Sequence, residues 1–85
     1  MTNEEMIETL ESLAAALEIG IRYENLSHGR IAASKGGLCR LRGRPVIIVD
    51  KRACLEEKKD LLLQSLRRFD LSGVYVVPAI RELLE

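Results

Sequence analysis

Few side chains in this sequence are of the types that act as nucleophiles or metal ligands. The chain has one histidine, His28, and two cysteines, Cys39 and Cys54. A structural or catalytic zinc site needs three or four ligands at close, repeated spacing, and neither C-x-x-C nor H-x-x-x-H occurs here. A nucleophilic Cys39 would need a neighbouring base, and the adjacent Arg40 is not one. We therefore predict a protein that is not an enzyme, with no catalytic residue, no metal site and no cofactor.

The glycine pair Gly36-Gly37 is the only glycine-rich element that resembles a phosphate-binding loop. Such loops lead from a strand into the first turn of a helix, where free backbone N–H groups face the phosphate. This pair precedes an expected strand instead, a position typical of a relaxed backbone at a strand entrance. The pattern favours a structural role and predicts no nucleotide site.

Basic side chains are concentrated in the middle of the chain, most densely at Arg40, Arg42 and Arg44. Arginines at this spacing are suited to phosphate contacts. Tyr23 alone in this region offers an aromatic ring on which a base could stack. Two interpretations stay open: a nucleic-acid contact, or a sheet face that meets solvent or the acidic helix of the same or a second subunit.

Formal net charge is +0, yet the charges are segregated along the sequence. Residues 1–19 carry five acids and no Lys or Arg, whereas residues 20–52 carry eight bases and two acids. This segregation is the most distinctive global feature of the chain, and it indicates contacts between oppositely charged surfaces.

Length and composition indicate one small folded domain over residues 1–85. Hydrophobic residues make up 47% of the chain, which is enough for one core, and small domains often gain stability by self-association. The start of the chain is acidic, and no stretch approaches the roughly 20 apolar residues that span a bilayer. We expect a cytoplasmic protein with no membrane contact and with a second copy or another protein as partner. Two cysteines in a reducing compartment are usually plain buried thiols, and a disulfide between Cys39 and Cys54, which needs Cα atoms within about 7 Å, stays open.

The first expected element is a helix. Thr2 and Glu5 have the spacing of a capping box, and Gly20 is a typical helix end. An apolar stripe follows at helical spacing: Met6, Ile7, Leu10, Leu13, Ala14 and Leu17. Residues 21–24 alternate like a half-buried strand, and residues 25–35 are polar and predict a loop.

A hairpin is expected next, from residues 37–42 and 45–50. With Gly43-Arg44 as a type II′ turn, apolar side chains face each other across the strands. That register places Leu41 opposite Val46, and Cys39 opposite Ile48. The continuous apolar run at residues 46–49 predicts a central strand covered on both faces, or nearly so.

The last third of the chain predicts two more helices. The first spans about Cys54 to Phe69, with an apolar stripe made of Leu55, Leu62, Leu66 and Phe69, which Leu61 and Leu63 widen. The second begins at Pro78 after an extended segment at 74–77 and ends near Leu84. The fold class is therefore α+β: a small three-stranded, largely antiparallel sheet packed with an N-terminal helix, a long second helix and a short C-terminal helix.

The segments 17–24, 36–41 and 46–50 together resemble the front half of the ImmA/IrrE-type metallopeptidase domain. In that family a helix precedes a small sheet, and the next helix carries H-E-x-x-H, which binds zinc and supplies the general base. The resemblance places Gln64 and Arg68 at the two histidine positions and Ser65 at the glutamate. It therefore implies a relative that lacks both zinc ligands and base. The chain also resembles short bacterial proteins that share its Arg-Phe-Asp-Leu and final Pro-x-x-Arg-Glu-Leu-Leu patterns.

The leading functional hypothesis is a non-catalytic protein-interaction or dimerisation domain. Its expected interface includes apolar residues of the C-terminal stretch, such as Val74, Val76 and Ile80, taken to be exposed. The alternative is a nucleic-acid-associated regulatory module that uses the basic hairpin. The third hypothesis, a minimal hydrolase, would depend on Cys39 or His28.

Overall fold

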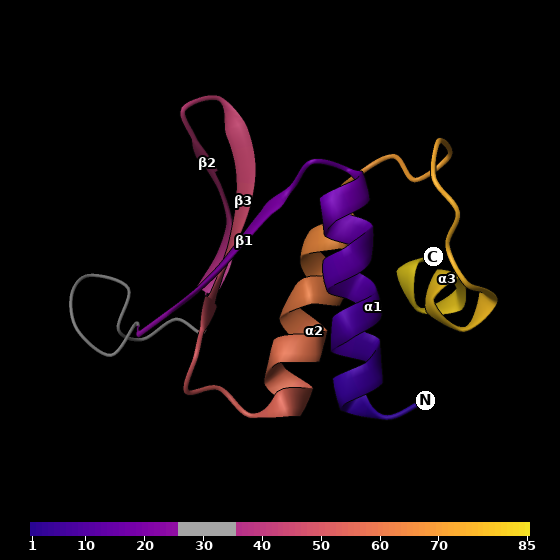
Figure 1. Cartoon of the computed structure of the whole chain (residues 1–85), viewed down its shortest axis with the longest axis horizontal. Coiled ribbons are helices and arrows are strands. Elements are labelled where there is room, and N and C mark those ends of the chain that lie inside the picture. Colours follow the sequence, from indigo (N-terminus) through magenta and orange to yellow (C-terminus); the bar gives the residue numbers. More distant parts are fainter. Residues whose placement is uncertain (26–35) are drawn as a thin grey trace.

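The computed structural model describes residues 1–25 and 36–85. His28 therefore lies outside the described residues, and so does the expected loop at 25–35 except for its first residue. The described elements, in chain order, are α1 (Asn3–Ala16), β1 (Gly20–Glu24), β2 (Gly36–Leu41), β3 (Arg44–Asp50), α2 (Leu55–Leu66) and α3 (Pro78–Leu84). The protein is an α+β fold with a three-stranded sheet and three helices, in the order that the sequence predicts (Figure 1).

Helix α1 begins with the predicted capping box. The Thr2 hydroxyl accepts a hydrogen bond from the Glu5 N–H at 3.1 Å, and Glu5 Oε1 accepts from the Thr2 N–H at 2.8 Å. The helix ends earlier than expected, because Glu18 rather than Gly20 takes the left-handed conformation, with φ 60°. The Ile19 N–H then reaches back to the Ala14 carbonyl at 2.8 Å, as in a Schellman motif.

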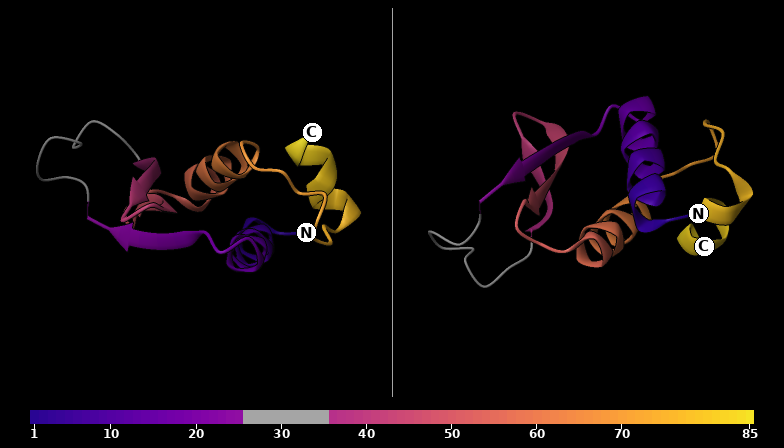
Figure 2. Two further views of the ribbon diagram at one scale, coloured as in Figure 1. Left: turned by 90° about the horizontal axis from the view of Figure 1, so that it is seen from above. Right: turned by 60° about the horizontal axis from the view of Figure 1, so that its bottom comes forward.

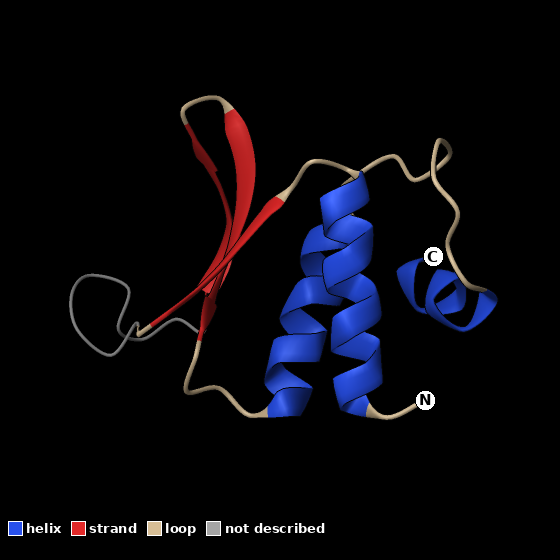
Figure 3. Ribbon diagram, in the orientation of Figure 1, coloured by secondary structure: helices blue, strands red, loops and turns tan. Residues whose placement is uncertain are grey.

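The sheet has the strand order β1-β3-β2 and is mixed. Strand β2 pairs with β3 in antiparallel fashion, as expected of a hairpin, but β1 runs parallel to β3. The expectation of a largely antiparallel sheet is thus wrong for one of its two pairings. Strand β2 lies at the edge of the sheet away from β1. Strand β3 runs through the centre in the same direction as β1 (Figure 3).

The hairpin register also differs from the expected one. The turn is Arg42-Gly43, with φ values of 53° and 80°, and it joins Leu41 directly to Arg44. Positive φ at both central residues is typical of a type I′ turn, whose twist matches that of the strands. Cys39 therefore pairs with Val46, two residues from the predicted partner. A shift of two residues keeps every side chain on its face, so the hydrophobic pattern did not distinguish the two registers.

Strand β3 is central, as predicted, but described helices cover only one of its faces. Ile47 and Val49 are fully buried against the helices, whereas Val46 and Ile48 on the opposite face are half-buried. Figure 1 shows α1 and α2 together on one side of the sheet. The expectation of cover on both faces is therefore not met by the described residues.

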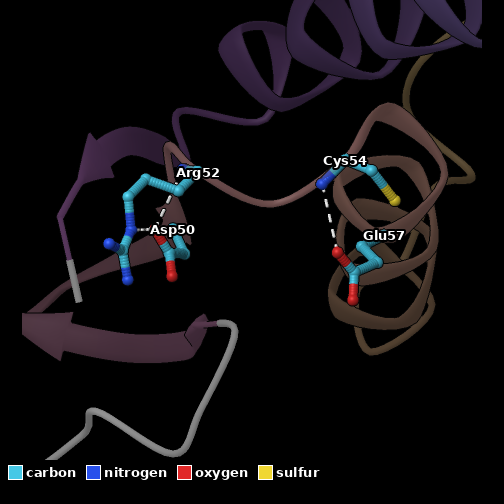
Figure 4. Close-up of polar contacts among 4 residues, drawn as sticks. All are labelled: Asp50, Arg52, Cys54 and Glu57. Carbon is cyan, nitrogen blue, oxygen red and sulfur yellow. Dashed lines mark hydrogen bonds and ion pairs between the residues drawn. The ribbon is translucent and has the colours of Figure 1, made fainter. Parts of the chain in front are cut away.

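A tight connection leads from β3 into α2 (Figure 4). The buried Asp50 accepts a hydrogen bond from the Arg52 N–H at 3.0 Å, and its carbonyl accepts from Ala53. At the start of α2, Glu57 Oε1 accepts a hydrogen bond from the Cys54 N–H at 3.1 Å and so caps the helix. These contacts fix the direction in which α2 leaves the sheet.

The helices form two further layers beyond the sheet. Helices α1 and α2 lie side by side in the middle, and α3 packs on their far side (Figure 2). The Arg67 guanidinium at the end of α2 donates two hydrogen bonds to the Leu83 carbonyl, at 3.0 and 2.7 Å, and so fixes α3. Leu55, expected in the apolar stripe of α2, is exposed, and Ser65 is buried instead. No helix of the described residues is long and apolar enough to cross a membrane.

Candidate functional site

Two adjoining cavities lie between strand β2 and the C-terminal half of α2. The first has a volume of about 320 Å³ and is lined by Gly36, Gly37, Leu38, Leu61, Gln64, Ser65 and Arg68. The second, of about 350 Å³, is lined by Leu38, Cys39, Arg40, Pro45, Arg68 and Phe69. Leu38 and Arg68 line both cavities, so the two form one trough along β2. We call these eleven residues the β2–α2 groove.

Small residues create the space at one end of this groove. Gly36 has φ +124°, and a Cβ on it would lie 1.9 Å from the Ile48 carbonyl oxygen, so only glycine fits there. A Cβ on Gly37 would meet no atom within 4 Å, because this position faces open space. On the helix, Ser65 is 4% exposed and occupies little volume at its place in α2. Gly36 therefore has the structural role that its sequence context favours, whereas the space around Gly37 would also accept a side chain.

The charge of the groove is positive. Arg40 and Arg68 line it, and no acidic residue of the described chain does. One guanidinium nitrogen of Arg40 donates to the Gly43 carbonyl at 3.1 Å, which leaves its other donors available. Among the described residues, no carboxylate lies within ion-pair distance of either arginine. The groove thus holds two positive charges that the described part of the fold does not neutralise.

Among the described residues, positions 38–41 of strand β2 present a free edge beside the groove. No described strand pairs with its outer side, because the strand order is β1-β3-β2. Residues of an antiparallel pair alternate between hydrogen-bonded and non-hydrogen-bonded positions, and the two-residue turn makes Leu41–Arg44 a hydrogen-bonded pair. By this alternation Leu38 and Arg40 direct their backbone N–H and C=O groups outward. Backbone groups of this kind are a template for pairing with another extended chain.

The three arginines predicted as an interaction site do not form one flat surface. Arg40 is on β2 and lines the groove, Arg42 is in the turn, and Arg44 begins β3. All three are exposed. Tyr23, the aromatic residue nearest in sequence, is hydrogen-bonded to Glu11 of α1 rather than placed beside them.

The apolar residues of the C-terminal stretch lie elsewhere. Val74, Val76 and Ile80 line a hollow of about 430 Å³ against α1, together with Tyr75 and other uncharged residues. Val76 is 4% exposed and Ile80 is fully buried, so the expectation that both are exposed is wrong. They belong to the core because α3 folds back onto the α1–α2 layer. Of these three residues only Val74 is half-buried rather than buried, and its part in an interface remains a prediction.

The two cysteines are separate and free, with Cys39 half-buried and Cys54 exposed. No three His, Cys, Asp or Glu side chains within residues 1–25 and 36–85 come together as metal ligands. The three residues that the expected resemblance would put at the zinc motif, Gln64, Ser65 and Arg68, all line the groove. The sequence did not predict a site at these three positions, although their shared place in that motif is a signal that points to one. No protein-family model, curated protein or solved structure matches this chain.

Proposed function

We propose that this chain is a non-catalytic protein-interaction domain that binds an extended segment of another protein along strand β2. The observation that carries the proposal is the free edge of β2 running beside the β2–α2 groove. In strand addition, main-chain hydrogen bonds to a sheet edge supply affinity, and neighbouring pockets select alternate side chains of the incoming segment. The groove lies where such side chains would enter.

The chemistry of the groove supports binding rather than catalysis. A zinc site needs three or four thiolate, imidazole or carboxylate ligands, and the groove offers one thiol, Cys39, beside the amide, hydroxyl and guanidinium of Gln64, Ser65 and Arg68. A guanidinium is always protonated, so it serves neither as a ligand nor as a general base.

A partner protein suits the groove better than a second copy does. Pairing of two β2 edges about a two-fold axis would bring the Arg40 and Arg68 side chains of both copies together. Like charges at a shared interface cost free energy. A cytoplasmic location is part of the proposal, since two unpaired cysteines suit a reducing compartment.

The test is selection of binders from a library of random twelve-residue peptides, followed by NMR with the selected peptides. In the free protein, the amide protons of Leu38 and Arg40 should exchange rapidly with solvent; bound peptide should protect both. Arg40→Pro removes an outward N–H without removing a β2–β3 hydrogen bond, so it should abolish binding more completely than Arg40→Ala. If no peptide binds, or if binding leaves both amides unprotected, the proposal is wrong.

Light scattering after size exclusion, at low and at high salt, tests whether a partner protein or a second copy of this chain binds the edge of β2. A monomer that binds the selected peptides agrees with the proposal. A salt-resistant dimer whose Leu38 and Arg40 amides are already protected would show that a second copy occupies the edge and would overturn the choice of a partner protein.

A further inference from the structure

We propose that the segment bound along β2 carries an acidic residue whose carboxylate sits between Arg40 and Arg68. This inference rests on the proposed function and adds the chemistry of the partner. Its basis is that two arginines from different parts of the fold, one on β2 and one just beyond α2, line the same cavity of about 350 Å³. Within the described chain, neither has a carboxylate partner.

The surroundings of these arginines favour a carboxylate. The same cavity is lined by Leu38, Pro45 and Phe69, which are apolar. Arg40 and Arg68 are exposed, and apolar surface beside them lowers the local dielectric constant and so strengthens the attraction between opposite charges. A guanidinium presents paired N–H donors that match the two oxygens of a carboxylate, so two of them can hold one acidic side chain.

The register of β2 indicates which position of the bound segment carries the acidic residue. Leu38 and Arg40 are two residues apart and therefore point to the same face of the sheet, the face that packs on the helices. A strand paired with β2 places alternate side chains on that face, and the side chain opposite Arg40 has its Cβ about 5 Å away. The acidic residue is the one opposite Arg40, and the residue two positions away faces the cavity end with Gln64 and Ser65.

A protein segment fits this site better than a nucleic acid. Single-stranded nucleic acids bind where aromatic rings are presented for stacking. The aromatic ring in the cavity, Phe69, is packed against the core, and Tyr23 is engaged by Glu11 and Lys58. Nucleic-acid binding through Arg40, Arg42 and Arg44 is therefore the alternative that the experiment below tests with single-stranded DNA.

The experiment uses the peptides selected from the random library. Asp or Glu should be enriched at one position of the binders, and replacing that residue by Asn or Gln should weaken binding about 10- to 100-fold. Arg68→Gln should weaken the binding of the acidic peptide by a similar factor. It should leave unchanged the binding of the peptide in which Asn or Gln replaces the acidic residue. Arg44→Gln is the matched control, because Arg44 is exposed on the same hairpin and outside the groove. It should change affinity less than about threefold.

The outcomes separate the two proposals. Peptides that protect the Leu38 and Arg40 amides but show no acidic preference, or that bind Arg68→Gln unchanged, overturn this inference and leave the proposed function standing. No binding of any peptide overturns both. Tighter, salt-sensitive binding of a 20-nucleotide single-stranded DNA that is lost in Arg42→Ala and Arg44→Ala would instead support the nucleic-acid alternative and overturn the inference. Circular dichroism of each variant, unchanged from the parent chain, keeps these comparisons on folded protein.

Discussion

The hydroxyl of Tyr23 on β1 donates a hydrogen bond to the carboxylate of Glu11 on α1. The ring of the same tyrosine lies under the ammonium group of Lys58 on α2, 5.6 Å from its centroid. One side chain thus connects the sheet to both helices of the middle layer. Helix α2 forms one wall of the groove, so this contact helps to set the distance between α2 and the sheet.

Replacing Tyr23 with Phe removes the hydroxyl and keeps the ring. We expect the free energy of unfolding to fall by about 1 kcal/mol, the usual contribution of one side-chain hydrogen bond. Tyr75→Phe is the control, because Tyr75 is 79% exposed and no hydrogen bond is recorded for its hydroxyl among the described residues. Urea denaturation measures both. Equal stability of the two variants would show that the Tyr23–Glu11 contact contributes nothing.

The same contact predicts a dependence of stability on alkaline pH. Burial, together with the Glu11 carboxylate, raises the pKa of Tyr23 above its ordinary value. In the unfolded chain the phenol loses its proton near pH 10, whereas the folded protein holds it at higher pH. The free energy of unfolding therefore decreases as pH rises above about 10. Tyr23→Phe has no phenol to titrate at this position, so its stability does not show this decrease. The difference in free energy of unfolding between the parent chain and Tyr23→Phe should therefore shrink between pH 9 and 11. Parallel pH profiles would contradict the assignment.

Side-chain periodicity predicted the parts of the fold that bury apolar surface. The α1 stripe is buried at Ile7, Leu10 and Leu13, and β3 is central, because burial leaves a repeating pattern in the sequence. The parallel pairing of β1 with β3 leaves no such pattern, since a strand reads alike in either direction. The exposed Leu55 and the buried Val76 depend on how the elements pack together, which local periodicity does not encode.

The groove was harder to predict for a related reason. Its eleven residues come from segments far apart in the sequence, and their types are ordinary: two glycines, two leucines, two arginines, and one each of glutamine, serine, cysteine, proline and phenylalanine. The basic hairpin drew attention to Arg40, but its partner Arg68 lies 28 positions further along the chain. Only the packing of α2 beside β2 brings the two into one cavity.

The observed turn predicts a stabilising substitution. Arg42 has φ 53°, a left-handed conformation that is unfavourable for a long side chain, and the next residue is Gly43. Asn-Gly is the preferred sequence of a type I′ turn. Arg42→Asn should raise the free energy of unfolding by about 0.5–1 kcal/mol, measured by thermal or urea unfolding. Arg44→Asn, on the extended strand β3, should give no gain. A stabilising Arg44→Asn with a neutral Arg42→Asn would favour the Gly43-Arg44 turn instead.

The two adjacent glycines of β2 should respond in opposite ways to the same substitution. Gly36→Ala places a methyl group 1.9 Å from the Ile48 carbonyl oxygen, at a φ of +124° that alanine rarely adopts. Strand β2 would have to move away from β3, and we expect a loss of about 3 kcal/mol or more, a large share of the stability of a domain this small.

Gly37→Ala is the matched control, because its methyl group would meet no atom within 4 Å. Its stability should stay within about 0.5 kcal/mol of the parent chain. Urea denaturation of the two variants, with circular dichroism to confirm the folded state, measures the difference. Similar stabilities would mean that β2 does not approach Ile48 closely at Gly36, and the narrow end of the groove would then have a different shape. A large loss at Gly36 alone supports the close β2–β3 contact on which both the free edge and the groove depend.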